Sequence, residues 1–181
     1  METVIICEGP SDEAILRSIL RGTIGEGNFG VVPAGGESAA ISLARTYLAT
    51  DDCRVALVVD ADTTDPDKAA EQNLILQESL GLAGPRERFV VLQAVPTIEA
   101  WLFADEALAR EIFGSSLSDT VAYRARFEPK AVLQELLAER AKAGGVDALA
   151  RLLESHDFTR LVGSEPIAKL RDFLMASVAA E

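Results

Sequence analysis

Short apolar runs alternate with helical patterns through the first half of the chain. Four runs have the length and the Val, Ile and Leu content of strands that are buried on both faces of a parallel sheet. They cover residues 3–7, 28–32, 54–59 and 89–95. Between them, apolar residues recur at helical spacing over residues 13–20, 38–48 and 66–80. This alternation predicts an α/β fold, in which right-handed crossovers place helices on both faces of a four-stranded parallel sheet.

The pattern changes after Pro96, where helical periodicity replaces the strand-like runs. We predict four helices, over residues 99–113, 129–143, 146–153 and 167–178. The segments 114–118 and 123–127 are expected to be loops. Residues 1–98 are therefore expected to form the α/β domain, and residues 99–181 an all-helical extension that packs on it.

The charge balance narrows the range of functions. The 181 residues include 17 Lys and Arg against 29 Asp and Glu, which gives a formal net charge of −12. A protein that holds nucleic acid by general electrostatics needs an excess of basic residues. A function on nucleic acid would therefore require metal ions or a partner to supply much of the attraction.

Membrane and secretory signals are not expected in this sequence. No apolar run reaches the roughly 18 residues of a membrane span, and the start of the chain lacks a basic segment followed by an apolar stretch. Cys7 and Cys53 are too few for a disulfide framework or a zinc site. We expect a cytoplasmic protein with no membrane partner.

Acidic residues stand at the ends of the first and third predicted strands. Glu8 follows the first, and Asp60 and Asp62 follow the third. The carboxyl ends of parallel strands share the edge at which open α/β sheets bind ligands. Residues two apart on an extended segment point the same way, so Asp60 and Asp62 are expected to face one crevice with Glu8. Three carboxylates there would repel one another unless a hard cation, Mg²⁺ or Mn²⁺, lay between them.

Three further acids are candidates for the same site. Glu99 follows the fourth strand and would be a metal ligand or the base that deprotonates water; the alternative is a first-turn acid that complements the helix dipole. Asp12 and Asp105 would support the metal ligands or bind a second ion. The plainer interpretations are that Asp12 caps the first helix and that Asp105 is a surface acid.

Phosphate contacts are expected from three glycines and one lysine. Gly9 permits a tight turn close to a ligand. Gly35 and Gly36 would let a phosphate reach backbone amides at a helix start, although a simple turn explains them as well. Lys130 follows a basic and aromatic segment, residues 123–127, of a kind that contacts phosphates; a solvated loop is the alternative.

Taken in order, these residues resemble the TOPRIM domain, the Rossmann-like catalytic module shared by topoisomerases, bacterial primases and OLD-type nucleases. The resemblance covers roughly the first 100 residues. Its motifs follow the first, second and third strands in turn, and are Glu8-Gly9-x-x-Asp12, Gly35-Gly36 and Asp60-x-Asp62. The rest of the chain, with a Pro-x-Ile-Glu-Ala-Trp-Leu-x-Ala-Asp segment, is similar to small stand-alone bacterial TOPRIM proteins, which are nearer the OLD nucleases than the topoisomerases.

The resemblance implies a Mg²⁺-dependent nuclease, or a related phosphoryl-transfer enzyme, that acts on nucleic acid, with DNA favoured over RNA. Glu8, Asp60 and Asp62 would be the metal ligands, and Glu8 or Glu99 the base. The Arg-Glu-Gly-Glu continuation of topoisomerases is missing after Asp62, and so is a Tyr-bearing strand-passage domain, so topoisomerase activity is not expected. OLD proteins carry an ATPase domain that this chain lacks, which makes a separate ATPase a candidate partner.

Two other functions remain open. One is a non-catalytic metal-binding or nucleic-acid-binding subunit of a defence or repair complex. The other is a haloacid-dehalogenase-like phosphatase, because residues 60–64 match the Asp-x-Asp-x-Thr nucleophile loop of that family by letters. That loop normally follows the first core strand, whereas here it follows the third.

Overall fold

The computed structural model describes residues 3–24, 29–50, 52–140 and 145–176. Its strands are β1 (Thr3–Cys7), β2 (Phe29–Pro33), β3 (Arg54–Asp60) and β4 (Phe89–Ala94). Its α-helices are α1 (Pro10–Thr23), α2 (Glu37–Thr50), α3 (Pro66–Gly81), α4 (Glu106–Phe113), α5 (Asp119–Arg124), α6 (Pro129–Arg140), α7 (Val146–Glu154) and α8 (Glu165–Met175). The predicted strands and most of the predicted helices are present, with ends that differ by a few residues.

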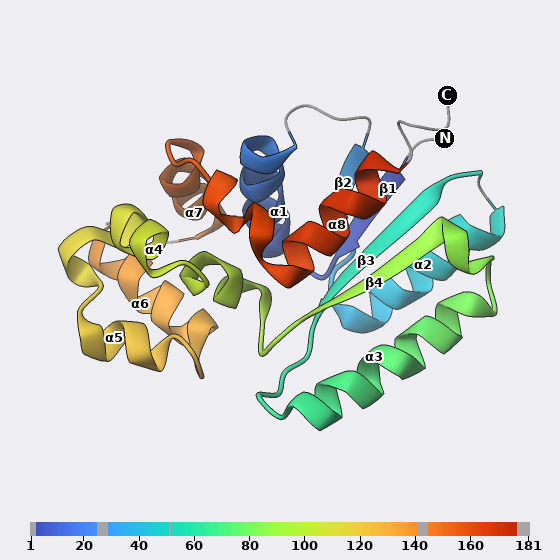
Figure 1. The fold of residues 1–181 in the computed structure, drawn as a ribbon, viewed down its shortest axis with the longest axis horizontal. Coiled ribbons are helices and arrows are strands. Elements are labelled where there is room, and N and C mark those ends of the chain that lie inside the picture. The colour runs from blue at the N-terminus through green and yellow to red at the C-terminus, as the bar shows by residue number, and fades with distance from the viewer. Residues whose placement is uncertain (1–2, 25–28, 51, 141–144, 177–181) are drawn as a thin grey trace.

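The four strands form one parallel sheet in the order β2-β1-β3-β4 (Figure 1). The predicted α/β class is therefore confirmed. The chain moves from β1 outward to β2 through α1, then returns past β1 to β3 through α2. The direction of the crossovers thus reverses between β1 and β3. Open α/β sheets bind their ligands at such a switch point, beyond the carboxyl ends of the strands.

Alternate residues of each strand enter separate hydrophobic clusters on the two faces of the sheet. Ile5 and Cys7 of β1 pack with α1 and the C-terminal helices, whereas Val4 and Ile6 pack with α2 and α3. All five residues of β1 are buried. Burial on both faces explains why β1, β3 and β4 are mainly apolar runs and do not alternate with polar residues, whereas the edge strand β2 is mostly half-buried.

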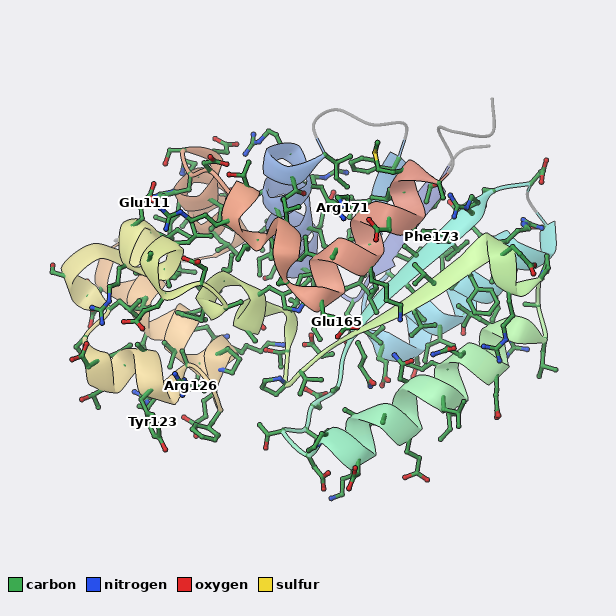
Figure 2. All side chains as sticks on the ribbon, viewed as in Figure 1. Glu111, Tyr123, Arg126, Glu165, Arg171 and Phe173 are labelled. Atoms are coloured by element: carbon green, nitrogen blue, oxygen red, sulfur yellow. The ribbon has the colours of Figure 1, made fainter. Side chains whose placement is uncertain are left out.

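The C-terminal helices complete the face of the sheet that α1 covers in part. Helix α8 packs on β4, and α7 packs on α1. Phe173 of α8, labelled in Figure 2, is held by Arg54 of β3. The Arg54 guanidinium donates to the Phe173 carbonyl at 2.7 Å and lies 3.8 Å from the centroid of the Phe173 ring. Residues of both halves, such as Ile5, Leu149 and Phe158, belong to the same hydrophobic cluster.

The prediction of one helix over residues 99–113 is wrong. A 3-10 helix, η2 (Ile98–Phe103), comes first, and α4 follows it. Asp105 separates the two, since its backbone is extended and its carboxylate accepts the N–H of Leu108 at 2.7 Å. The side chain thereby satisfies a donor at the start of α4, so a new helix begins there.

The prediction of loops between residues 114 and 127 is also partly wrong. Gly114–Ser116 forms a short 3-10 helix, and α5 includes Tyr123 and Arg124. Ser118 begins α5 by accepting the N–H of Val121 at 3.3 Å. The pair Ser118-Asp119 is a recognisable helix start, a signal that the basic and aromatic residues after it obscured. Residue 28 and the predicted helical residues 141–143, 177 and 178 lie outside the described ranges.

Across these ranges, the search for a helix with the length and apolarity needed to cross a membrane found none.

Candidate functional site

Glu8 and Asp60 meet at the switch point between β1 and β3. Glu8 follows the last residue of β1, and Asp60 is the last residue of β3. The Glu8 Oε1 atom accepts the backbone N–H of Asp60 at 2.8 Å. Asp60 Oδ1 in turn accepts the backbone N–H of Ile98, in the segment after β4, at 2.8 Å. Two hydrogen bonds therefore join the ends of three strands.

The Asp60 carboxyl is buried among other acids, with only 8% of its side chain exposed. Burial raises the pKa of Asp60 to about 7, and the charges of Glu99, Asp12 and Glu8 add to the shift, while the N–H of Ile98 opposes it. A carboxyl with this pKa is only partly ionised near neutral pH. A nearby cation would favour its charged form.

Asp12 lies in the first turn of α1 and faces the same edge. The helix begins at Pro10, a favourable first position, so Gly9 and not Asp12 is the N-cap residue. Asp12 is the third helical residue, and its Oδ2 atom accepts the N–H of Gly9 at 2.8 Å. Burial raises the pKa of Asp12, and the charges of Glu99 and Glu8 add to the increase.

The glycine turn after β2 holds the backbone of Glu8. The N–H groups of Gly35 and Gly36 both donate to the Glu8 carbonyl at 2.8 Å. Their φ angles, 91° and 117°, lie in the region that L side chains rarely adopt, which explains why both are glycine. The two amides are thus used within the protein and support the position of Glu8.

Glu99 is almost fully buried beside the end of β4, with 3% of its surface exposed. The Thr97 hydroxyl donates to Glu99 Oε2 at 2.6 Å. Sequence reasoning missed Thr97, because a threonine near a helix start is common and carries no specific signal. The carbonyl of Pro96 accepts the N–H groups of Ala61 and Asp62, which links the loops after β3 and β4.

Asp62 does not share the extended backbone on which its predicted orientation depended. Its φ is +50°, and the residue is exposed. The extended backbone that the prediction assumed therefore ends before Asp62, although the charge of Asp62 still acts on Lys130. The chain turns at Asp62 because its N–H bonds to the Pro96 carbonyl at 2.9 Å.

Lys130, the second residue of α6, supplies a positive charge to these acids. Its Nζ atom lies 3.9 Å from Asp60 Oδ2. Burial alone would lower the pKa of Lys130, but a set of carboxylates outweighs this effect and raises it. The set comprises Glu99, Asp60, Asp12 and Asp62. The helical half of the chain thus contributes to the site, and we call Glu8, Asp12, Asp60, Glu99 and Lys130 the carboxylate edge.

Asp105 has a different environment from the acids of the carboxylate edge. Its carboxylate caps α4, as described above, and its Oδ1 atom lies 3.9 Å from Arg160. These contacts account for Asp105 as a helix cap with a nearby cation.

The donor atoms of the carboxylate edge are the hard oxygens that Mg²⁺ and Mn²⁺ prefer. Glu8 and Asp60 each use one carboxylate oxygen for a backbone N–H, and each has a second oxygen to offer a ligand. Among the described residues, however, no group of three or more His, Cys, Asp or Glu side chains is arranged so that it could hold a metal ion. The chemistry of the donors fits a divalent cation, and rotation of the side chains would have to bring them together.

No protein-family model matches the chain, and the search of the curated proteins found no match. The function is therefore inferred from the geometry and the chemistry of the carboxylate edge.

Proposed function

We propose that the protein is a TOPRIM-like, Mg²⁺-dependent nuclease that acts on nucleic-acid phosphodiesters, DNA in preference to RNA. The observation that carries the proposal is the hydrogen bond from the Asp60 N–H to the Glu8 carboxylate across the switch point, with the buried Glu99 and Asp12 carboxyls nearby. A buried group of acids with a single lysine costs free energy in the apo protein. A catalytic cation at this edge would offset that cost.

In this proposal Glu8, Asp60 and Asp62 hold the ion, and Asp12 supports them. A bound Mg²⁺ or Mn²⁺ would activate water and stabilise the departing oxygen. The Lys130 ammonium would contact the phosphate, which it can reach because its side chain is 58% exposed. Glu8 or Glu99 would take the proton from the attacking water. The Thr97 hydroxyl would fix the orientation of the Glu99 carboxylate.

The test is cleavage of plasmid DNA, single-stranded DNA and RNA in the presence of Mg²⁺ or Mn²⁺. We expect the double variant Asp60→Ala/Asp62→Ala to lose at least about 100-fold in rate, since single groups that stabilise a transition state contribute this much. The matched control is Glu106→Ala/Asp119→Ala, which removes two exposed acids elsewhere and should cleave at the wild-type rate. Equal cleavage by the wild type and the Asp60/Asp62 variant would indicate contamination and overturn the proposal.

A second candidate, a non-catalytic metal-binding or nucleic-acid-binding subunit that works with a partner such as an ATPase, is favoured by one observation. The acids of the described residues are not gathered into a formed metal site, as expected of an edge that binds an ion without the fixed geometry that catalysis requires. This candidate predicts that Mg²⁺ raises the melting temperature while none of the three nucleic acids is cleaved. Turnover of p-nitrophenyl phosphate that disappears in Asp60→Asn would indicate a phosphatase in place of both.

A further inference from the structure

A cavity of about 340 Å³ opens beside the carboxylate edge, between α6 and α7. Two residues of the edge, Glu99 and Lys130, also line the cavity. The cavity and the carboxylates are therefore neighbouring parts of one depression. Lys130 is paired with Asp60, so a ligand in the cavity that contacted Lys130 would lie close to the Asp60 carboxylate.

The walls of the cavity are mainly aliphatic. Leu133 and Leu137 of α6 face it together with Leu149 of α7, and Leu133 and Leu149 are 3% and 2% exposed. Gln134, in the same turn of α6, adds a side-chain amide, which can both donate and accept hydrogen bonds. Apolar walls with a few polar groups at one side are typical of sites for small organic groups.

The leucine walls, the Gln134 amide and the nearby Lys130 together limit what the cavity would bind. A nucleobase has two apolar faces and a polar edge, and a sugar links it to a phosphate. Its faces would pack on the leucines, its edge would meet Gln134, and the attached phosphate would lie near Lys130. A base that is stacked and paired in a duplex cannot enter such a cavity without leaving the helix.

The net charge of the chain also favours binding through a base. With a formal net charge of −12, the protein is poorly suited to hold a duplex by the many phosphate contacts on which non-specific binding depends. Contacts to a base would supply binding free energy that does not require a basic surface, because burial of the base faces against aliphatic walls is favourable.

We propose that this cavity binds an unpaired nucleobase next to the scissile phosphate, so that the substrate is single-stranded nucleic acid. The inference rests on the proposed nuclease function and specifies its substrate. Discrimination between single strand and duplex would then come from the helical half of the chain, through α6 and α7.

The experiment measures binding of a fluorescein-labelled oligo-dT and of its duplex with oligo-dA by fluorescence anisotropy, with Ca²⁺ in place of Mg²⁺. We expect the single strand to bind at least about tenfold more tightly than the duplex, because only an unpaired base can bury its faces in the cavity. Leu137→Trp, which fills the cavity, should lose this preference. Leu74→Trp, at an exposed position of α3 on the other face of the sheet, should keep it.

A second measurement uses only the wild-type protein and so does not depend on the folding of a variant. A strand of the same length and backbone in which every position is abasic should bind at least about tenfold more weakly than oligo-dT, because it offers no base to the cavity. Equal affinity for single strand and duplex, or equal affinity for oligo-dT and the fully abasic strand, would overturn the inference while cleavage by the wild type still upheld the nuclease. If the wild type bound and cleaved no nucleic acid, the proposed function itself would fail.

Discussion

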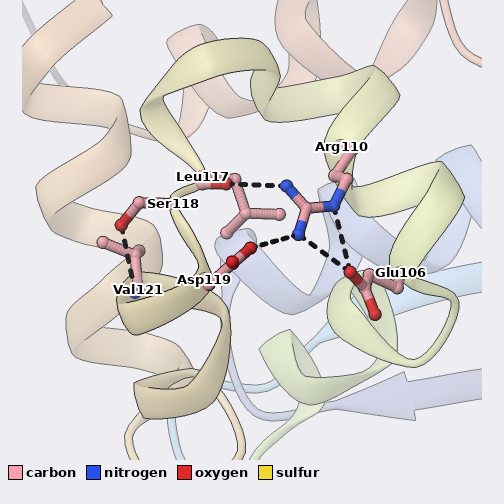
Figure 3. Close-up of polar contacts among 6 residues, drawn as sticks. All are labelled: Glu106, Arg110, Leu117, Ser118, Asp119 and Val121. Carbon is pink, nitrogen blue, oxygen red and sulfur yellow. Dashed lines mark hydrogen bonds and ion pairs between the residues drawn. The ribbon is translucent and has the colours of Figure 1, made fainter.

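Two groups of charged residues in this molecule are built in opposite ways. At the carboxylate edge, four acids from different segments lie with one lysine, which is paired with Asp60, and Asp60, Asp12 and Glu99 are buried. Between α4 and α5, Arg110 lies in the open with its acids (Figure 3): its guanidinium donates to Glu106 at 2.8 Å and to Asp119 at 2.6 Å.

The two groups differ in how far water screens their charges. The acids around Arg110 are exposed by 70% and 93%, so water screens them and the ion pairs contribute little to stability. The acids of the carboxylate edge are withdrawn from water, which raises the pKa of Asp60 to about 7. A fold keeps such an arrangement at a cost, and perturbed carboxyls in a crevice are candidates for function.

The largest expected effect that sharpens this comparison is a loss of stability with rising pH in the absence of divalent ions. The folded-state pKa of Asp60, about 7, exceeds its unfolded value of 3.8, so the folded protein binds the proton more tightly. The resulting stability is present below about pH 4 and is lost as the pH rises through about 7, with an upper bound of about 4 kcal/mol. Asp12 acts in the same direction.

The measurement is the urea midpoint of unfolding from about pH 5 to about pH 8, with EDTA present. Asp60→Asn should flatten this pH dependence and exceed the wild type in stability at the alkaline end. Asp119→Asn, in the exposed network, should retain the wild-type slope. An unchanged slope in Asp60→Asn would show that the two groups of charges do not differ in the way described.

The next effect is stabilisation by Mg²⁺, which follows from the proposed cation site. Only ionised carboxylates bind the ion, so protons compete with it below the pKa of Asp60. We expect a rise in melting temperature at about pH 8 and a much smaller one at about pH 6. At a free Mg²⁺ concentration of about 100 times Kd the gain would be about 2.7 kcal/mol. An equal gain in Asp60→Asn would place the ion elsewhere.

Thr97 offers a smaller test of how the buried acids are held. Thr97→Val keeps the shape of the side chain but removes the hydroxyl that donates to Glu99 at 2.6 Å. Because Glu99 is buried, the loss should destabilise the protein by about 1–3 kcal/mol in the urea midpoint. Thr97→Ser restores the donor and should recover most of the loss. Equal stability of all three proteins would mean that Glu99 is solvated in solution.

The strands and their terminal acids could be predicted because the signals are local. A buried parallel strand is a continuous apolar run, and parallel strands end at one edge, so Glu8 and Asp60 could be placed together before the strand order was known. The switch point between β1 and β3 could not be predicted, because its position depends on which neighbour each strand pairs with. The turn at Asp62 could not be predicted either, because its backbone N–H bonds to the Pro96 carbonyl in the segment after β4.

The other features that could not be predicted depend on contacts between segments that are distant in the sequence. Lys130 was expected to contact phosphate, but its place beside Asp60 depends on how α6 docks near the sheet, which no local pattern encodes. The amides of Gly35 and Gly36 were candidates for a phosphate, and the structure directs both to the Glu8 carbonyl. The two glycines correctly indicated an unusual backbone conformation, but only the fold determined which group their amides would bind.

The smallest expected change in stability comes from the exposed ion pairs of Arg110, and it tests whether exposed charges contribute little. Hydrogen bonds that Arg110 donates to Asp119 and Glu106 raise the pKa of Arg110, but arginine is already charged between about pH 5 and about pH 8, so no pH dependence follows. Arg110→Ala should leave the urea midpoint, its pH dependence and any Mg²⁺-dependent cleavage close to those of the wild type. A marked loss of stability that high salt does not reproduce would show that the network is more than a solvated surface. In that case, the burial of the charged groups would no longer explain why the two regions contribute differently to stability.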